Sequence, residues 1–168
     1  MQVRCGTDII EVKRIEGSLK SNSRFAGKVF TDAEIEYCEN RKAGRYESYA
    51  ARFTAKEAFM KALGTGLFGG AALTEIEVVN SPGVDSGAEA GADTGVGADD
   101  DPVASPGAEA GADTKMNRVN SGAPSLRLHG GAADLYRQIG GVSMSLSLSH
   151  TADTALAVVV ILCGDGSR

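Results

Sequence analysis

The stretch RFTAKEAFMKALGTG, residues 52–66, constrains the fold most, because as a helix it has no plain water-facing side. At about 100° per residue, its alanines, Phe59 and Leu63 form one broad apolar face, whereas Phe53 and Met60 lie on the opposite side. Its charges flank the Phe53/Met60 stripe: Arg52 and Lys56 on one side, Glu57 and Lys61 on the other. These four charges must therefore face partners other than bulk water.

The rest of the chain alternates strands and helices. Thr31 to Glu34 form a capping box that begins a helix ending near Arg41, and Gly64 ends the central helix, expected over about 46–63. Further expected elements are a strand ending near Val12 with a short helix after it, a strand at 75–79, a strand at 125–129, a helix at 131–139, and strands at 142–149 and 154–162 joined by a polar turn at 150–153. This pattern predicts an α+β fold, with an antiparallel sheet packed with helices.

An acidic, low-complexity segment at about 81–120 interrupts this pattern. GAEAGADT occurs at 87–94 and again at 107–114, and the segment lacks aromatic residues, so we expect a disordered insertion. The chain is then a single domain over 1–168, split by the insertion. The segment 81–114 holds eight acidic residues and no basic ones, which leaves 17 basic and 14 acidic residues elsewhere. This mildly basic remainder suits an anionic ligand or an acidic partner.

Composition also narrows the location and the partners. No apolar run approaches the roughly 18 residues that span a bilayer, and the first residues lack the hydrophobic region of a signal peptide. We therefore expect a cytoplasmic protein with no membrane or nucleic-acid partner. Cys5, Cys38 and Cys163 are far apart and odd in number, which indicates neither a disulfide framework nor a zinc site.

The glycine-rich GTGLFG at 64–69 matches GxGxxG but lies in the wrong context. A dinucleotide fingerprint needs a preceding strand and a following helix, whereas here a helix precedes and a strand follows. We interpret it as a helix end followed by a flexible loop whose amides could still touch a ligand. Asp8 lies beside Ile9 and Ile10, which are expected to form part of the core, and Glu57 lies in the helix without a water-facing side. Each carboxylate is therefore expected to meet a cation, either a basic side chain or a metal such as Mg²⁺.

The segment Ser149-His150-Thr151 ends an alternating strand, VSMSLSLSH. Small hydroxyls and a histidine at a turn can bind phosphate, or the turn can hydrogen-bond its own backbone. A hydrolase using Ser149 and His150 is a further hypothesis, although adjacency in sequence does not assemble a catalytic triad. His129, at another strand end, is expected to be structural.

Three motifs together are far more specific than any one of them. GTD at 6–8, FTAKEAFMKALGTG at 53–66 and SLSHT at 147–151, in this order, resemble the 4′-phosphopantetheinyl transferases, most closely the small holo-acyl-carrier-protein synthases. The likeness covers nearly the whole chain except the insertion. It implies the 4′-phosphopantetheinyl transferase fold in a single-repeat subunit, and transfer of 4′-phosphopantetheine from coenzyme A to a serine of apo acyl carrier protein, with release of 3′,5′-ADP.

The resemblance also implies a set of site residues. Asp8 and Glu57 would hold Mg²⁺, with Glu57 the first candidate for the general base, and Lys61 would stabilise or protonate the leaving group. The implied coenzyme A contacts are Arg52, Lys56, Lys61, Gly64, Gly66, His150 and Thr151. Phosphoryl transfer needs mainly positioning and charge neutralisation, which such a set supplies.

A basic surface on the first helix is expected to dock the acidic carrier protein. Its basic residues are Lys13, Arg14, Lys20 and Arg24, and Phe25 is expected to belong to an apolar centre between them. The resemblance implies a homotrimer with active sites shared between subunits, in which Phe53 and Met60 could face a neighbour. The alternative to an enzyme is a non-catalytic coenzyme A or carrier-protein binding module.

Overall fold

The computed structural model describes residues 1–65, 70–80 and 123–164. Its elements in chain order are β1 (Gln2–Glu11), α1 (Val12–Ser21), α2 (Phe25–Val29), α3 (Asp32–Asn40), η1 (Lys42–Gly44), α4 (Arg45–Leu63), η2 (Leu73–Glu75), β2 (Ile76–Asn80), β3 (Pro124–Leu128), α5 (Gly130–Gln138), β4 (Gly141–His150) and β5 (Thr154–Cys163). The predicted elements are all present within a few residues, and the prediction of an α+β fold is confirmed. Only the short helix α2 and the two 3₁₀ turns were not predicted.

The strands form two antiparallel sheets. The larger sheet has the order β1-β5-β4, so the N-terminal strand pairs with the C-terminal one, with Asp8 opposite Ala157. The smaller sheet is the pair β2-β3, with Asn80 opposite Pro124. Because the sequence predicted one sheet, this division into two is a finding of the structure.

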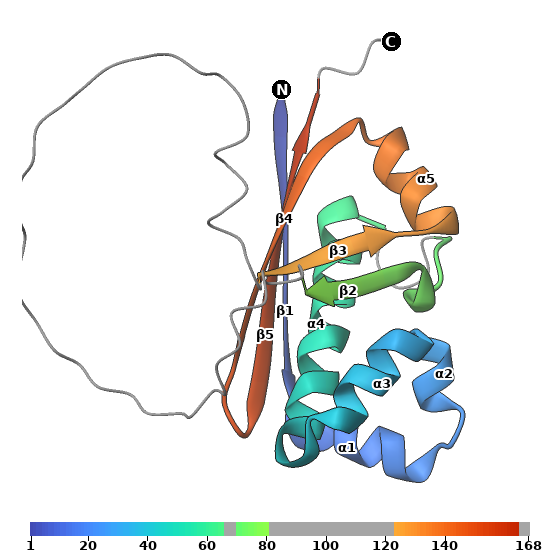
Figure 1. Ribbon diagram of the computed structural model, residues 1–168. Helices are drawn as coiled ribbons and strands as arrows, with labels where there is room; N and C mark the ends of the chain where they lie inside the picture. Colours follow the sequence, from blue (N-terminus) through green and yellow to red (C-terminus); the bar gives the residue numbers. More distant parts are fainter. Residues whose placement is uncertain (66–69, 81–122, 165–168) are drawn as a thin grey trace, which may run out of the picture. The chain divides into compact units, whose positions relative to one another are not determined.

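Helix α4 lies against one face of the larger sheet and is central to the described fold (Figure 1). It contacts β1 and β5 along its length, and 13 of its 19 residues are buried. It ends at Gly64, whose φ of 80° is the left-handed conformation that favours glycine at a helix C-cap. The absence of a water-facing side on this helix is therefore explained by packing on most sides.

Helices α1, α2 and α3 lie around the first half of α4, whereas α5 packs near η2 and β4 (Figure 1). The predicted capping box is confirmed: the Thr31 hydroxyl accepts from the Glu34 amide, and the Glu34 carboxylate accepts from the Thr31 amide. Phe25 packs edge-on against Phe30 and stacks on Phe53, and Met60 is fully buried. Of the two places left open for these side chains, the structure puts Met60 in the core of its own chain, and Phe53 packs partly buried against the cluster that includes α1–α3.

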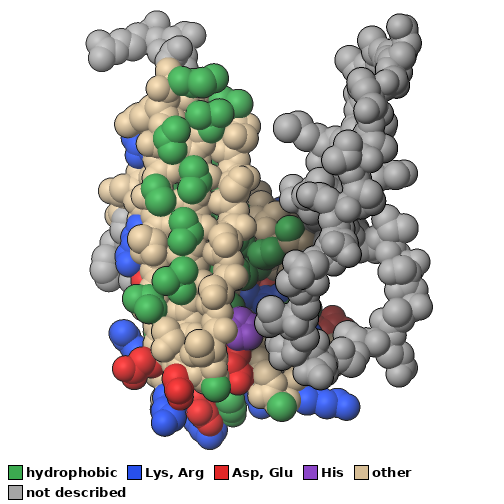
Figure 2. Space-filling model, turned by 90° about the vertical axis from the view of Figure 1, so that its left-hand side faces the viewer, with side chains coloured by type: hydrophobic (Ala, Val, Ile, Leu, Met, Phe, Trp, Pro, Cys, Tyr) green, Lys and Arg blue, Asp and Glu red, His purple; other side chains and the backbone are tan. Residues whose placement is uncertain are grey.

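The face of the larger sheet that points away from α4 has an apolar surface, which no helix of the described residues covers (Figure 2). Val3 and Ile9 on β1 are 66% and 64% exposed, and Val160 on β5 is 38% exposed. Side chains alternate along a strand, so Val3 and Ile9 point outward while Ile10 points into the core. Ile9 was expected in the core, and its exposure leaves an apolar surface that needs a partner.

The predicted insertion at about 81–120 lies outside the described residues, so the single split domain stays a prediction. The strands on either side of the insertion are described, and their ends lie opposite each other. No helix in the described ranges is long and apolar enough to cross a membrane.

Candidate functional site

A glycine sets the distance between β1 and α4 at the candidate site. A Cβ built on Gly6 would lie 2.0 Å from the Ala58 carbonyl oxygen and 2.4 Å from the Ala62 amide nitrogen, so no larger residue fits there. This close approach also brings Asp8, two residues further along the same face of β1, to α4. The sequence contained a signal for this role, since a glycine inside a strand often marks such a contact.

Asp8 and Lys61 form an ion pair across this contact. The Lys61 ammonium lies 2.9 Å from the Asp8 carboxylate; the lysine side chain is half exposed, whereas the Asp8 side chain is mostly buried. Glu57 stands one helical turn before Lys61 and on the same side of α4. The structure therefore brings together Asp8, Glu57 and Lys61, as the sequence predicted from two distant motifs.

Glu57 has a carboxylate oxygen in this cluster that accepts no hydrogen bond from the described residues. Its side chain is 8% exposed, and Oε1 is buried without a hydrogen-bond partner in the described part of the chain. Burial raises the pKa of Glu57, and the nearby Asp8 carboxylate raises it further, while Lys61 and Arg14 oppose the shift. A buried carboxylate oxygen without a donor is costly, so this atom is suited to a ligand that the protein itself does not supply.

The donor set fits Mg²⁺ better than a metal with an all-protein cage. Among the described residues there is no group of three or more His, Cys, Asp or Glu side chains that could hold a metal. Mg²⁺ commonly takes one or two carboxylates and completes its shell with waters and substrate phosphates. Asp8 and Glu57 would provide two oxygen ligands of that kind, with the free Oε1 of Glu57 as one of them.

Arg52 occupies a different environment on the other flank of α4. Its guanidinium lies 3.9 Å from the centre of the Tyr37 ring and donates to the Ser48 carbonyl at 3.4 Å. Its Nε is buried without a partner among the described residues. A cavity of about 350 Å³ is lined by Ala33, Glu34, Tyr37, Arg52, Glu77, Val78, Val79, Asn80 and Arg127. Arg52 therefore remains a candidate phosphate ligand, in a pocket away from Glu57.

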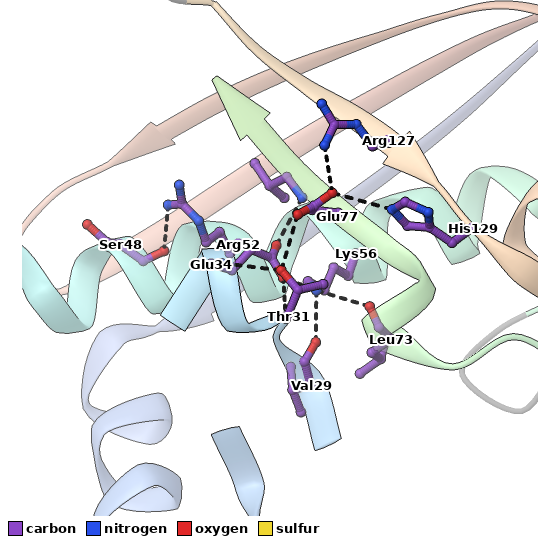
Figure 3. A network of polar contacts seen from close by, with 11 residues as sticks. Val29, Thr31, Glu34, Ser48, Arg52, Lys56, Leu73, Glu77, Arg127 and His129 are labelled. Atoms are coloured by element: carbon purple, nitrogen blue, oxygen red, sulfur yellow. Dashed lines mark hydrogen bonds and ion pairs between the residues drawn. The ribbon is translucent and has the colours of Figure 1, made fainter. Parts of the chain in front are cut away.

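Lys56 reaches neither site: its ammonium is held inside the chain, an arrangement that gives no support to the predicted contact with coenzyme A. The side chain is fully buried, and its ammonium donates to Glu34 Oε2 at 2.6 Å and to the Val29 and Leu73 carbonyls at 2.8 and 3.0 Å (Figure 3). Burial lowers the pKa of Lys56, and Glu34 opposes that shift. With three acceptors in place, the ammonium is fully satisfied and ties α2, α3 and η2 to α4.

Two carboxylates organise the pocket beside Lys56, and the sequence did not single out Glu77. Glu34 accepts from the Val78 amide at 2.9 Å in addition to closing the capping box. Glu77 is 8% exposed and contacts the Thr31 hydroxyl, Arg127 and His129, each at 3.3 Å (Figure 3). His129 thus has a structural partner, as expected.

The strand end at His150 shares a face with Asp8 without touching it. His150 is the last residue of β4 and pairs with the buried Ala155, which places its side chain on the α4-facing side. No hydrogen bond or ion pair within the described residues joins it to Asp8, Glu57 or Lys61. Ser149 is the preceding residue in the same strand and points to the opposite face, which argues against a Ser149–His150 dyad.

Thr151 and Gly64 have clear local roles. The Thr151 hydroxyl accepts from the Asp153 and Thr154 amides at 3.3 and 3.1 Å, so the turn satisfies its own backbone while the hydroxyl hydrogen remains available. Gly64 caps α4 next to Lys61, and Gly66 lies outside the described residues.

The predicted docking surface is partly engaged within the chain. Lys13, Arg14 and Arg24 are exposed, whereas Lys20 pairs with Glu16 at 2.6 Å. Phe25 is partly buried in the ring cluster described above, so it is a less accessible apolar centre than expected. Arg14 is close enough to influence Glu57, which links this surface to the Asp8–Glu57–Lys61 cluster.

Comparisons with known proteins agree with this geometry. A family model of the 4′-phosphopantetheinyl transferase superfamily matches residues 4–93. The holo-[acyl-carrier-protein] synthase of Ruminiclostridium cellulolyticum is 40% identical over all of this chain and 98% of its own, and that of Koribacter versatilis is 36% identical over 93% and 94%. A crystal structure of the Bacillus anthracis holo-(acyl-carrier-protein) synthase in complex with CoA (3′,5′-ADP) is 26% identical, covers 96% of each chain and has a TM-score of 0.60.

The matched region includes β1 and α4, and with them Gly6, Asp8, Glu57 and Lys61. The relatives extend the match over β3, α5, β4 and β5. This chain belongs to the 4′-phosphopantetheinyl transferase superfamily.

Proposed function

We propose that this chain is a holo-acyl-carrier-protein synthase, which transfers 4′-phosphopantetheine from coenzyme A to a serine of apo acyl carrier protein and releases 3′,5′-ADP. The observation that carries the proposal is the cluster of Asp8, Glu57 and Lys61, in which Glu57 Oε1 is buried without a partner in the described residues. Family membership and the likeness to holo-acyl-carrier-protein synthases support the same reaction. The acceptor is the carrier protein of fatty acid biosynthesis, in the cytoplasm.

Mg²⁺ belongs to the proposal, with Asp8 and Glu57 as its protein ligands. When bound, the ion would neutralise charge on the pyrophosphate of coenzyme A. Lys61, which pairs with Asp8 at 2.9 Å, has a half-exposed ammonium that can turn to the same pyrophosphate. The two carboxylates would hold the ion, and the ion and Lys61 would together offset negative charge on the pyrophosphate.

The chain's own residues act by positioning and proton transfer. The serine oxygen of the carrier forms a bond to the β-phosphorus of coenzyme A, and the bond from that phosphorus to the bridging oxygen breaks, so that 3′,5′-ADP leaves. The serine proton passes to a carboxylate, with Glu57 the first candidate, because it lies one helical turn from Lys61 and close to Asp8 in the proposed site. Lys61 stabilises the charge that develops on the leaving phosphate.

Coenzyme A is proposed to extend over residues that one subunit does not bring together. Arg52 and its pocket lie on one flank of α4, and Glu57 and Lys61 lie on the other. A ligand that touches both sets therefore needs two subunits, with Arg52, His150 and Thr151 as phosphate contacts and Gly64 beside the nucleotide. Lys56 is left out of this set because its ammonium already donates to Glu34 and to two backbone carbonyls, whereas Arg52 lines a cavity.

A homotrimer with shared sites accounts for this geometry. The outward face of β1 and β5 carries Val3, Ile9 and Val160 in an exposed apolar surface (Figure 2). Burying this surface against copies of the same chain would stabilise the assembly by about 25 cal/mol for each Å² of apolar surface removed from water. In such an assembly, we propose that the Arg52 pocket of one subunit completes the site at the Glu57 cluster of another.

Acyl carrier protein is proposed to dock on α1 and the segment after it. Lys13, Arg14 and Arg24 present exposed positive charge suited to an acidic partner. Arg14 also lies near Glu57, so a carrier bound there would hold its serine close to the reacting phosphate.

The decisive experiment mixes the full chain with apo acyl carrier protein and coenzyme A, with Mg²⁺ or with a chelator, and weighs the carrier by mass spectrometry. We expect the mass of one phosphopantetheine group to be added only when Mg²⁺ is present. Binding of coenzyme A or carrier without added mass would instead favour the non-catalytic binding module. Addition of the phosphopantetheine group in the presence of chelator would contradict the proposed requirement for Mg²⁺.

A further inference from the structure

Arg4 is a cation of β1 that none of the functional motifs includes. It lies on the same α4-facing side of the strand as Gly6 and Asp8, because side chains alternate and these positions are two residues apart. Along β1 toward its N-terminus, this row runs beside the last turns of α4. Asp8 meets Lys61, Gly6 meets Ala58 and Ala62, and Arg4 meets Leu63.

The guanidinium of Arg4 is fixed at the end of α4. Its Nη1 donates to the Leu63 carbonyl at 2.9 Å, and a Cβ built on Gly64 would lie 3.8 Å from the same nitrogen. Gly64 is exposed and has no side chain to cover the guanidinium. Arg4 is therefore held beside the backbone that leads from Lys61 to Thr65.

The charge of Arg4 is not neutralised within the described residues. Lys56, Lys61 and Arg127 each pair with a carboxylate, whereas no ion pair in this part of the chain involves Arg4. The Arg4 Nε is also buried without a hydrogen-bond partner there. The only hydrogen bond that the described residues give to the side chain uses one of its five N–H groups, which leaves donors and a full positive charge at the edge of the site.

We propose that Arg4 is a further binding residue for coenzyme A, whose guanidinium contacts a phosphate at the C-terminal end of α4. The inference rests on the proposed function, because it takes Gly64 to lie beside the nucleotide. A guanidinium matches a phosphate in shape and charge, and hydrogen bonds between charged groups are stronger than those between neutral ones. The competing role is a helix cap alone, since a cation at a helix C-terminus also stabilises the helix.

The test uses the full chain with Arg4→Met, Arg4→Lys and a control, Arg137→Met. Arg137 is an exposed arginine that pairs with Asp134 on α5, so its variant also loses one cation and one contact. We expect Arg4→Met to raise the KM for coenzyme A on the order of tenfold with kcat changed less than about twofold, and to weaken 3′,5′-ADP binding by calorimetry to a similar degree. Arg4→Lys should recover part of the coenzyme A KM and part of the 3′,5′-ADP affinity, and Arg137→Met should change neither quantity.

Thermal unfolding of the same variants separates binding from capping. A lower melting temperature for Arg4→Met with unchanged KM and unchanged 3′,5′-ADP affinity would overturn the proposal and leave Arg4 as a cap. The calorimetry also separates this inference from the proposed function. A wild-type chain that binds 3′,5′-ADP but transfers nothing would refute the enzyme and still test Arg4, whereas a wild-type chain that binds no nucleotide would overturn both.

Discussion

Glu57 and Lys56 are neighbours in sequence, yet each meets a different physical constraint. Lys56 has a carboxylate and two carbonyls around its ammonium, and Glu57 has a buried oxygen without a partner in the described residues. The first arrangement stabilises the fold, and the second leaves a residue ready for a ligand. Their opposite roles follow from the helix, because consecutive residues are about 100° apart around its axis.

Glu57→Gln should make the metal-free protein more stable and the enzyme inactive. Because burial raises the pKa of Glu57, its ionised form costs the folded state stability above that raised pKa. Below the ordinary carboxyl pKa the group is protonated whether folded or unfolded, and the cost disappears. Urea unfolding in chelator should therefore show an advantage of the variant at neutral pH that fades as the pH falls. An advantage that stays constant with pH would contradict this account.

Lys61→Ala should lower turnover on the order of 10² to 10³, because it removes the cation proposed to stabilise the leaving phosphate. The measurement is kcat with saturating coenzyme A and carrier. Lys28→Ala, which removes an exposed lysine of α2, is the control and should leave kcat unchanged. Near-normal turnover of Lys61→Ala would remove this residue from the mechanism.

Lys56→Met should reduce the free energy of unfolding by about 3–5 kcal/mol, because Glu34 would keep a buried charge without its partner. Lys20→Met is a matched control: its ion pair with Glu16 has the same 2.6 Å separation but is exposed, so its loss should hardly change stability. Urea unfolding measures both. Equal, small effects of the two substitutions would show that burial of the Lys56–Glu34 pair does not matter.

At the level of elements, β2 and β3 pair although 43 residues separate them in the chain. Asn80 and Pro124 lie opposite each other, so the connection between them needs to span only the width of a hairpin. A connection of about 2–5 residues is enough for such a turn. The length of the intervening segment is therefore not required by the paired strands.

Deleting residues 82–119 should leave folding and transfer activity intact. The remaining Ser81 and residues 120–123 are enough to join β2 to β3 as a hairpin loop. The deletion also removes acidic charge that would repel an acidic carrier protein, so the KM for carrier should stay the same or fall. Melting temperature and kcat/KM are the measurements. An unfolded or inactive deletion variant would show that the segment has a structural or catalytic role.

The success of the sequence predictions depended on how local the signal was. The capping box at Thr31 and the helix end at Gly64 use backbone rules within a few residues, and both are present. The Asp8–Glu57–Lys61 cluster could be predicted because three motifs together resemble one family. The partners of Lys56 could not be predicted, because its three acceptors come from α2, α3 and η2, which only tertiary packing brings to α4. The prediction that Ile9 lies in the core was wrong for a similar reason. Alternating side chains show that a strand has two faces, but not which face is covered.

For the whole molecule, two features favour the proposed homotrimer: an exposed apolar sheet face, and proposed coenzyme A contacts that lie on opposite flanks of α4. Among residues 1–65, 70–80 and 123–164, no helix lies against the outward surface of β1 and β5, and α4 separates Arg52 from Glu57. A homotrimer would cover the apolar surface and would allow Arg52 of one subunit to act with Glu57 of another.

Val160→Lys should therefore give monomers by light scattering and lose transfer activity, because it places a charge in the apolar surface of the sheet. Gln138→Lys, which adds the same charge on α5, should remain trimeric and active.

Mixing two inactive variants tests whether the sites are shared. Glu57→Gln and Arg52→Met alter opposite flanks of α4, and each homotrimer would lack one half of every site. If Glu57 of one subunit works with Arg52 of another, co-refolding equal amounts should restore about a quarter of the sites, because each half must come from the chain in which it is intact. If both residues serve a site within one chain, every site keeps one defect and no activity returns. The restored fraction, measured against wild-type protein refolded in the same way, decides between the two arrangements.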